Sequence, residues 1–373
     1  MVTNAERREQ LRPQGLECPG CAGCQFHDLC GGYFNGRLFG NCFEELCCHF
    51  TGKEKAHCNA VCPYKADFDG WLADTRGLFF GGLPTIEQSE VDLPLYVPLI
   101  DHASSRSSAL DWPVVALKTY SVLGVRRTSG RYEAIADSPA ALRNAYLLAE
   151  NTKVVLRGIA GEAELEPYWE NRIPSDAPRQ LARLNVHSAI GPNFSHYLDV
   201  PRTDHLYNKH RQLICLVELA EAGIPVVPHL NSVMPGDWTF WRRYLEVNPS
   251  IKVVAIEFQT GNKNQREGRK VIDQLATTQA LLNRPLHLVL VGGAQFLEYA
   301  AASFARLSLI DSMAFHKTMR RFCFDPCRSG QPWRDGFTLI GQKLDELLVE
   351  NIAGYATWVE QRVQTARPAA RRN

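Results

Sequence analysis

The first residues of this sequence that could do chemistry are cysteines concentrated near the N-terminus. Nine of the twelve cysteines lie between residues 18 and 62, in a segment with almost no apolar periodicity. In a reducing compartment, where disulfides do not persist, thiolates at this density bind zinc or iron. The sequence therefore predicts a metal-binding module with the candidate ligands Cys18, Cys21, Cys24, Cys30, Cys42, Cys47, Cys48, Cys58 and Cys62.

Two kinds of metal centre are open for this module. Cys18, Cys21 and Cys24 form a C-x2-C-x2-C pattern, and Cys62 is followed by proline, as in the iron–sulfur ligation of bacterial ferredoxins. This spacing favours an iron–sulfur cluster on those four cysteines. Zinc would take thiolates in a tetrahedral arrangement and could recruit neighbouring histidines. We expect the module to be structural, or to dock nucleic acid, rather than to carry out a reaction.

A second set of polar residues stands at the ends of apolar runs. Carboxylates at such ends, here Asp101, Glu257 and Asp311, can act as general base, nucleophile or metal ligand. An isolated strand-end Asp can equally cap the next helix. The glycine pair 292–293 would admit an anion or a flat base, although turn chemistry explains such a pair as well. The strand-end residues are Asp101, His102, His187, Asn193, His229, Asn231, Glu257, Gln259, Thr260, Gly292, Gly293, Asp311 and Ser312.

The elements that must position these residues are eight apolar runs separated by helix-patterned segments. Continuous apolar runs, without alternation, are typical of parallel strands covered on both faces. Eight such units predict an α/β fold, a (β/α)8 TIM-type barrel, whose active site lies at the C-terminal ends of the strands. An open doubly wound sheet is the alternative, and residues 131–135 could add a further strand. The predicted strands are 95–100, 114–120, 153–158, 181–189, 224–230, 252–258, 286–292 and 307–311.

Composition sets the domain organisation and limits the partners. The 373 residues carry a net charge of +1, so any nucleic-acid contact must come from local basic patches. No run of about 18 apolar residues is present and the N-terminus is polar, so we expect a cytoplasmic protein with no membrane segment. The predicted division is a Cys-rich module over 1–66, a connector over 67–92, the barrel over 93–360 and a basic tail over 361–373.

One segment resembles a known family. Residues 284–321, which include RPLHLVLVGG, FLEYAAASF and SLIDSMAFHKTMRR, resemble the late-barrel segment of the tRNA-guanine transglycosylase superfamily, including its relatives that insert 7-deazaguanines into DNA. The resemblance extends over residues 220–321. It implies that Asp311 is the nucleophile that attacks C1′ as guanine departs, and it places Arg320 at the family's basic position. The implied activity is base exchange on guanine or 7-deazaguanine in a polynucleotide, either DNA or RNA.

The rest of the chain departs from that family. No DSGGFQ-type motif supplies its second Asp, so Asp101 takes the place of the acid that protonates the leaving purine, with Glu257 in reserve. The zinc motif after the nucleophile is not reproduced, and Cys323 and Cys327 are two candidate ligands there. The segments 191–202 and 220–233 are similar to an uncharacterised bacterial and phage family, a likeness that predicts no activity.

A basic rim would hold the polynucleotide, because lysine and arginine neutralise phosphates. A solvated loop is the alternative for the basic stretch 261–270. The residues predicted to bind substrate are Gly292, Gly293, Asn193, His229, Asn231, Gln259, Lys263, Arg266, Arg269 and Arg320.

Two other functions remain open. The first is a catalytically silent barrel that recognises nucleic acid, or protein partners of a bacterial or phage defence or DNA-modification system. The second is metal-dependent hydrolysis through His187, His229 and Glu257, which requires that three separate strand ends converge.

Overall fold

The protein forms two units, each described here by itself from a computed structural model. The structure describes residues 60–62, 65–78, 82–87, 90–125, 131–197, 200, 202–327, 332–339 and 341–367. Unit 1 comprises Met1–Thr85, Asn193–Cys215 and Asn231–Asn248, and unit 2 comprises Ile86–Pro192, Leu216–Leu230 and Pro249–Asn373. The sequence predicted continuous segments, whereas the units are discontinuous because two later stretches group with the N-terminal one.

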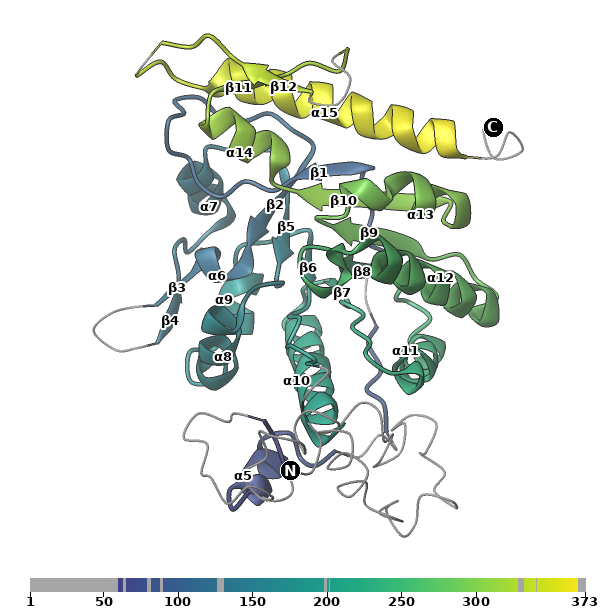
Figure 1. Ribbon diagram of the computed structural model, residues 1–373. Coiled ribbons are helices and arrows are strands. Elements are labelled where there is room, and N and C mark those ends of the chain that lie inside the picture. Colours follow the sequence, from purple (N-terminus) through teal and green to yellow (C-terminus); the bar gives the residue numbers. More distant parts are fainter. Residues whose placement is uncertain are drawn as a thin grey trace, which may run out of the picture. The chain divides into compact units, whose positions relative to one another are not determined.

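Unit 2 is a mixed α/β structure with two four-stranded parallel sheets (Figure 1). The first sheet has the order β1-β10-β9-β8, formed by Tyr96–Pro98, Arg306–Asp311, His287–Val291 and Val253–Glu257. The second has the order β2-β5-β6-β7, formed by Val114–Lys118, Lys153–Arg157, Ser188–Ile190 and Val226–Val227. These strands correspond to the eight predicted runs, and all except β10 are shorter than predicted. The run 181–189 is the one that differs most, because its first residues belong to a helix and β6 begins only at Ser188.

The edge strands of the two sheets also approach each other. A parallel bridge pairs Leu99, after β1, with Ala116 of β2, and the amide of Ile100 donates to the Ala116 carbonyl at 2.9 Å. At the other edge, a parallel bridge pairs His229, after β7, with Ala255 of β8. Each sheet is therefore linked to the other at both of its edges.

One apolar core is shared by both sheets. Its members are buried and recur at every second position of a strand, as the alternation of side chains along a strand requires. The cluster consists of Val91, Leu93, Val97, Leu99, Val114, Ala116, Val155, Ile159, Ile190, Val227, Val253, Ala255, Val289, Val291 and Ile310.

Helices follow most of the strands, and Figure 1 shows α7, α8 and α9 on one side of the unit 2 strands with α12 and α13 on the other. Local signals fix their ends: the Ser138 side chain accepts from the Ala141 amide and caps α7, and Asn264 caps α12 in the same way. The helices are α6 (Thr119–Val122), α7 (Pro139–Tyr146), α8 (Glu162–Asn171), α9 (Ala177–Ala182), α10 (Arg202–Glu221), α11 (Pro235–Val247), α12 (Gln265–Leu282), α13 (Leu297–Ser303), α14 (Met313–Met319) and α15 (Asp345–Ala366).

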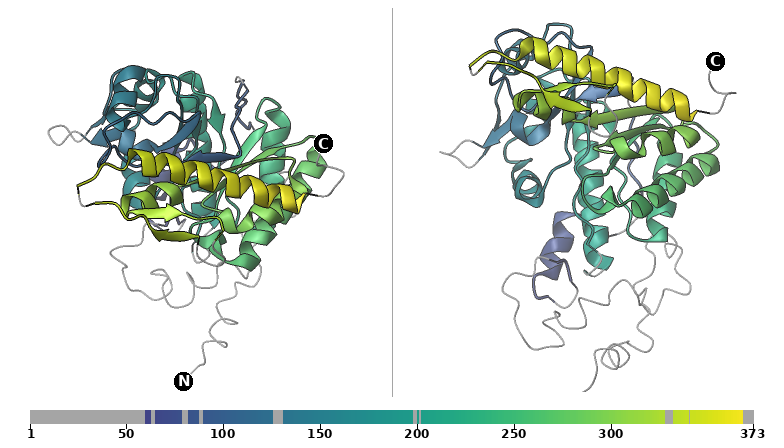
Figure 2. Two further views of the ribbon diagram at one scale, coloured as in Figure 1. Left: turned by 90° about the horizontal axis from the view of Figure 1, so that it is seen from above. Right: turned by 45° about the horizontal axis from the view of Figure 1, so that its top comes forward.

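Two antiparallel hairpins lie outside the parallel sheets. β3 (Leu123–Val125) pairs with β4 (Tyr132–Ala134), which accounts for the extra strand considered at 131–135. β11 (Phe322–Phe324) pairs with β12 (Trp333–Asp335). The last helix, α15, packs against α13, α14 and β11 (Figure 2) and continues past residue 360, where the sequence predicted the barrel to end.

Unit 1 contains α5 (Phe68–Asp74), α11 and the part of α10 up to Cys215. It contains a buried ion network, in which one Asp237 oxygen lies 2.7 Å from both Arg202 Nη2 and Lys209 Nζ. Two cations on one carboxylate lower the pKa of Asp237 well below its ordinary value, against the effect of burial, which raises it. In the described residues, no helix is long and apolar enough to cross a membrane.

Candidate functional site

A group of charged and polar side chains gathers at the C-terminal ends of the unit 2 strands. We call it the strand-end cluster: Asp101, Lys118, Arg157, Glu257 and Gln259. Four of these positions continue the every-second-residue pattern of the core cluster, as Asp101 follows Val97 and Leu99, and Glu257 follows Val253 and Ala255. Their side chains therefore lie on the same face of the strands as the core, at its polar end.

The charges of the cluster are divided between the two sheets. The acids belong to the first sheet, since Asp101 follows β1 and Glu257 ends β8. The cations belong to the second, since Lys118 ends β2 and Arg157 ends β5.

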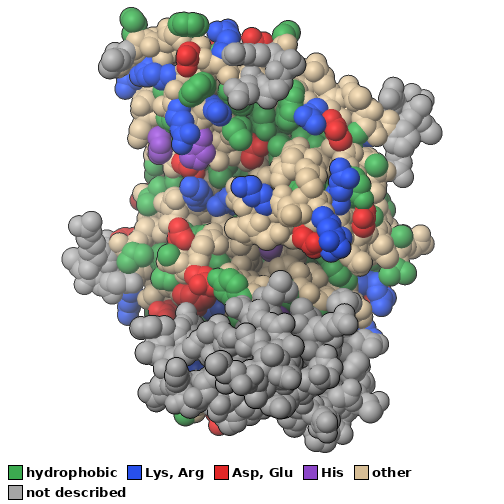
Figure 3. Space-filling model, in the orientation of Figure 1, with side chains coloured by type: hydrophobic (Ala, Val, Ile, Leu, Met, Phe, Trp, Pro, Cys, Tyr) green, Lys and Arg blue, Asp and Glu red, His purple; other side chains and the backbone are tan. Residues whose placement is uncertain are grey.

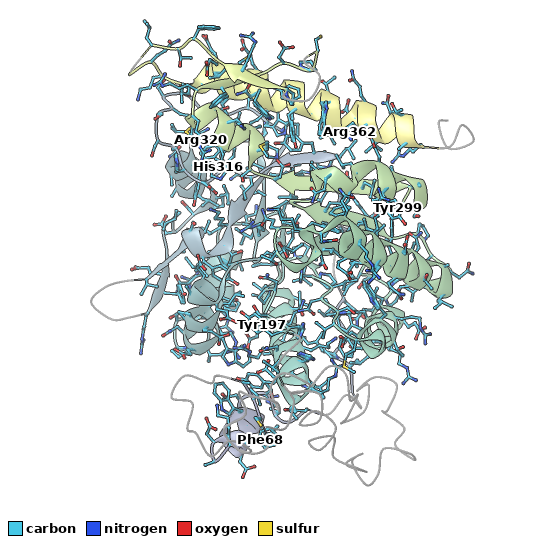
Figure 4. The ribbon with its side chains drawn as sticks, viewed as in Figure 1. Phe68, Tyr197, Tyr299, His316, Arg320 and Arg362 are labelled. Carbon is cyan, nitrogen blue, oxygen red and sulfur yellow. The ribbon has the colours of Figure 1, made fainter. Side chains whose placement is uncertain are left out.

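Asp101 is the acid of the cluster that contacts basic side chains. Lys118 Nζ lies 3.0 Å from its Oδ1 and His316 Nε2 lies 3.3 Å from its Oδ2, while the Asp101 side chain is only 13% exposed. His316 and Arg320 project from α14, the helix that follows β10 (Figure 4). On the same face, Figure 3 shows histidine side chains next to lysine and arginine side chains. The Asp101 carboxyl group therefore contacts two side chains that can carry protons.

Glu257 is buried but is held differently. Its Oε1 accepts from the backbone amide of Gln259, and its Oε2 accepts from the Thr260 hydroxyl at 2.9 Å. Among the described residues, no lysine, arginine or histidine forms an ion pair with it. Its carboxylate is thus oriented by hydrogen bonds while its charge remains without a directly bound cation.

Arg157 lies close to both acids without binding either directly. Its side chain makes one hydrogen bond to the described part of the chain, from Nη1 to Gln259 Oε1 at 3.2 Å, and its buried Nε has no acceptor there. Burial lowers the pKa of Arg157, and the charges of Asp101 and Glu257 oppose this effect. The Arg157 residue is 91% buried and most of its donors are unused among the described residues, so its guanidinium is available to a ligand.

Asp311 lies on the other face of its strand. Its neighbour Ile310 belongs to the core cluster, so Asp311 points toward the helices, where Tyr355 of α15 donates to Oδ2 at 3.1 Å and the Met313 amide donates to Oδ1 at 3.0 Å. Burial raises the pKa of Asp311 to about 6, and these hydrogen bonds lower it in part. The structure therefore does not bring Asp311 together with Asp101 and Glu257.

The glycine pair after β9 makes room for protein side chains. A Cβ on Gly292 would lie 2.4 Å from the Gln259 side chain, and one on Gly293 would lie 2.8 Å from the Phe258 ring. Gly292 also has φ +70°, a conformation that favours glycine. The space beside these two glycines, predicted to receive a ligand, is taken up by Gln259 and Phe258.

The two predicted histidines, His187 and His229, lie at opposite ends of the strands. His229 Nε2 accepts from the Glu257 amide at 3.2 Å, and burial lowers the pKa of His229 to about 3, so the ring is neutral at physiological pH. His187 instead precedes β6, at the opposite end of the strands, and its Nε2 contacts the Asp92 carbonyl at 2.8 Å. The convergence of His187, His229 and Glu257 is therefore wrong, because the predicted strand 181–189 began too early: β6 begins only at Ser188, so His187 lies before the strand and not at its C-terminal end.

The predicted asparagines lie in unit 1. Asn193 and Asn231 both belong to that unit, where the Asn231 amide donates to the Phe194 carbonyl at 3.1 Å. Their predicted role beside the strand ends stays a prediction.

The predicted basic rim begins directly after Glu257. Lys263 ends the 3-10 turn η2 (Gly261–Lys263), and the next basic residues lie in the first turns of α12. Arg266 has a side chain that is 82% exposed, and Arg269 packs its guanidinium 5.0 Å from the Tyr299 ring. Arg320 caps the C-terminus of α14. These cations are placed for contact with solvent, and their role in binding phosphates stays a prediction.

Most of the predicted metal ligands lie outside the described residues. Cys62 is the exception, and it is buried in unit 1, where its neighbour Val61 is fixed by two hydrogen bonds to α10: from its amide to Asp204 and from the Thr203 hydroxyl to its carbonyl. Cys323 lies on β11 and Cys327 in the turn after it. Within the described ranges, no group of three or more His, Cys, Asp or Glu side chains is arranged to hold a metal ion.

Three site residues were not predicted: Lys118, Arg157 and His316. The runs at β2 and β5 were extended past their last residues, so the basic side chains that end VVALK and KVVLR were counted as strand interior. Ending each run at the first charged residue after its apolar residues would have found both. No sequence signal connects His316 to Asp101, because that contact depends on the pairing of β1 with β10.

Comparison with protein-family models gave no match, and comparison with curated proteins gave none. The function of the strand-end cluster is therefore argued from its geometry and chemistry.

Proposed function

We propose that unit 2 is a (β/α)8 barrel whose strand-end cluster is the active site of a base-exchange transglycosylase. The barrel is supported by the bridges at both edges of the two sheets and by the single core that they share. The substrate class, guanine or 7-deazaguanine in a polynucleotide, comes from the resemblance of residues 284–321 to the tRNA-guanine transglycosylase superfamily. The observation that carries the proposal is a pair of carboxylates, Asp101 and Glu257, whose charges both act on the partly unused Arg157.

The proposal moves the nucleophile from Asp311 to Glu257. Glu257 is oriented by two hydrogen bonds and has no cation bound directly in the described residues, so its electron pair is available for attack at C1′. The Asp311 carboxyl group instead accepts a hydrogen bond from Tyr355 of α15.

The second acid, Asp101, acts through the neighbouring His316. As the bond from C1′ to the base breaks, the electron pair passes to the base, which takes a proton from His316. Asp101, whose Oδ2 lies 3.3 Å from His316 Nε2, positions that histidine for the transfer. The incoming base then displaces Glu257 from C1′ and returns the proton, which restores the enzyme. Binding the target nucleotide in this way requires that it leave the base stack.

The Cys-rich module is part of the proposal, with an iron–sulfur cluster preferred over zinc. Two observations support this part of the proposal. The first is the spacing of the cysteines, and the second is that Val61, the residue before Cys62, is hydrogen-bonded to α10. We assign the module no step of the reaction.

Covalent trapping tests this function. Wild-type protein, with its iron and zinc content measured first, is incubated with labelled DNA or RNA and a deazaguanine base and then denatured. The expected result is a covalent protein–nucleic acid band for the wild type and for Asp311→Asn, and none for Glu257→Gln. Asp111→Asn, a change of an exposed acid, is the matched control and should keep the band.

Two results would count against the assignment. Loss of the band in Asp311→Asn, with its retention in Glu257→Gln, would return the nucleophile to Asp311. Absence of a band from metal-replete wild type with either polymer would favour the second candidate, a recognition subunit without catalysis. One observation already favours that candidate: the family's nucleophile position, Asp311, faces α15 instead of the strand-end acids.

A further inference from the structure

Two apolar side chains stand in solvent just after the β11–β12 hairpin. Phe337 is 88% exposed and Leu339 is 77% exposed, the highest values of any large apolar residue in the described part of the chain. Both lie in the segment between β12 and α15 (Figure 1), and we call this pair the apolar tip. Folding usually removes such surface from water, because its burial is favourable. A pair that is kept in solvent is therefore a candidate for contact with another molecule.

Hydrogen bonds hold the apolar tip in place. Arg321 Nη1 donates to Thr338 Oγ1 at 2.7 Å and to the Leu339 carbonyl at 2.8 Å, and the Leu339 amide donates to Gln342 Oε1 at 2.9 Å. Phe337 has φ +48°, in the left-handed region that bulky residues rarely adopt. Residues held in such a conformation by their surroundings cluster at functional sites. The apolar tip is thus a fixed feature of the surface.

The apolar tip is connected to the strand-end cluster by two routes. The Leu344 amide donates to the Ser105 carbonyl at 2.9 Å, and Ser105 lies in the loop that follows Asp101. Arg321 follows α14, whose His316 Nε2 lies 3.3 Å from Asp101 Oδ2. The tip therefore lies at the same end of the unit 2 strands as the cluster.

The charge around the apolar tip indicates what covers it. Between residues 313 and 343, the described part of the chain carries five lysine or arginine side chains and two aspartates. Lysine and arginine bind phosphates, and proteins that open a duplex combine such contacts with an apolar side chain inserted between two base pairs. The cations are Lys317, Arg320, Arg321, Arg334 and Lys343, and the acids are Asp325 and Asp335.

A second copy of the chain fits this surface less well than a nucleic acid does. Two copies would bring like charges together, which opposes association. Two side chains are also a small part of the roughly 800 Å² per partner that a stable protein interface buries. A duplex carries the opposite charge, and the faces of its bases can stack on an aromatic ring.

We propose that Phe337 enters the base stack of a double-stranded polynucleotide and fills the space left by the nucleotide that turns out toward the strand-end cluster. The aromatic ring replaces the stacking of the departed base, which lowers the cost of taking that base out of the helix. This inference rests on the proposed function and deepens it by assigning a base-paired substrate and the residue that opens it. Phe337 contacts no reacting atom.

The fluorescence of 2-aminopurine tests the insertion without requiring any reaction, because this base emits strongly only when it is unstacked. Mixed-sequence duplexes of DNA and of RNA carry it next to a guanine and are titrated with the full-length protein. We expect the wild type to raise the fluorescence of at least one duplex. Phe337→Ala should abolish that rise and weaken duplex binding by roughly tenfold, the effect of one lost stacking contact, while the affinity for the single strand stays unchanged.

Three further comparisons identify the inserted residue. Phe337→Trp keeps an aromatic ring and should keep the rise in fluorescence. An abasic site opposite the guanine removes its pairing, so binding of that duplex by Phe337→Ala should recover toward the wild-type affinity. Leu281→Ala, at a side chain that is 64% exposed on α12, is the matched control and should behave as the wild type does.

Three results would overturn the inference. The first is a fluorescence rise in Phe337→Ala equal to that of the wild type, and the second is an equal loss of single-strand and duplex binding in that variant. The third is binding of both polymers by the wild type without any rise. Loss of self-association in Phe337→Ala, measured by sedimentation velocity, with unchanged duplex binding would assign the apolar tip to a second copy instead.

Failure of the inference is distinguishable from failure of the proposed function. A fluorescence rise that depends on Phe337, without a covalent band, would keep the insertion and remove the catalysis. A covalent band from a duplex that is equally strong in Phe337→Ala would do the reverse. Absence of binding to either polymer would remove both.

Discussion

Asp311 shows how much depends on which face of a strand a single residue occupies. Burial raises its pKa to about 6, while Tyr355 and the Met313 amide hold the carboxyl against the helices. The sequence predicted that an acid ends β10, which is correct. It could not predict the face, because a continuous apolar run such as LSLI has no polar alternation to mark its two sides, and a shift of one residue reverses them.

The raised pKa of Asp311 makes a prediction about stability and pH. Because the folded-state pKa lies above the ordinary value of 3.8, folding favours the protonated carboxyl. This stabilisation is fully present below about pH 4 and is lost as the pH rises through about 6. Between pH 4 and 7 we expect the free energy of unfolding of the wild type to fall by about 2 kcal/mol relative to Asp311→Asn. Urea denaturation across this range measures the difference.

A control separates this effect from the general pH dependence of the protein. Asp111 is exposed, so Asp111→Asn should follow the wild-type curve. Parallel curves for wild type and Asp311→Asn would show that Asp311 carries no such linkage.

At the scale of elements, the order of strands and helices in unit 2 follows from the sequence, and the contacts that fix the C-terminal elements do not. The buried Asn351 on α15 is an example: its oxygen accepts from the Phe324 amide at 2.7 Å, and its nitrogen donates to Thr318 Oγ1 at 2.8 Å and to the Phe322 carbonyl at 2.7 Å. It joins α14, β11 and α15. In the sequence it is one asparagine in an amphipathic helix, with no sign of partners 27 and more residues away.

Replacing Asn351 should destabilise this group of elements strongly. Asn351→Ala removes three hydrogen bonds and leaves the buried Phe324 amide without its acceptor, so we expect a loss of about 2–4 kcal/mol in the free energy of unfolding. Thr357→Ala, an exposed change on the same helix, should alter it by less than about 0.5 kcal/mol. Chemical denaturation followed by circular dichroism compares the two, and similar values for both variants would contradict a structural role for Asn351.

At the scale of the whole molecule, unit 1 is assembled from three separated stretches of chain, so no single domain boundary in the sequence separates it from unit 2. This organisation could not be predicted, because composition marks only the Cys-rich segment, and residues 193–215 and 231–248 read as ordinary helices between strands. Unit 1 contains a buried network in which Asp237 pairs with Arg202 and Lys209.

Removing the carboxylate from this network should loosen unit 1 first. Asp237→Asn leaves two buried cations without their counter-ion, a change that costs about 3–5 kcal/mol. We expect limited trypsin digestion, followed by mass spectrometry, to show new cleavages within unit 1 before any in unit 2. Asp176→Asn, which removes an exposed partner of Arg179, should digest as the wild type does. Equal acceleration in both units would mean that the network supports the whole chain rather than unit 1.

The division of charge between the two sheets has a physical consequence for any molecule bound at the strand ends. With both acids of the strand-end cluster on one sheet and both cations on the other, the site carries a permanent electric field directed from the second sheet toward the first. A bound carbonyl aligns its dipole with that field, which polarises the bond before any chemistry begins. Its infrared stretching frequency would then shift on binding, and charge-neutral variants of Arg157 and Glu257 would reduce the shift in steps.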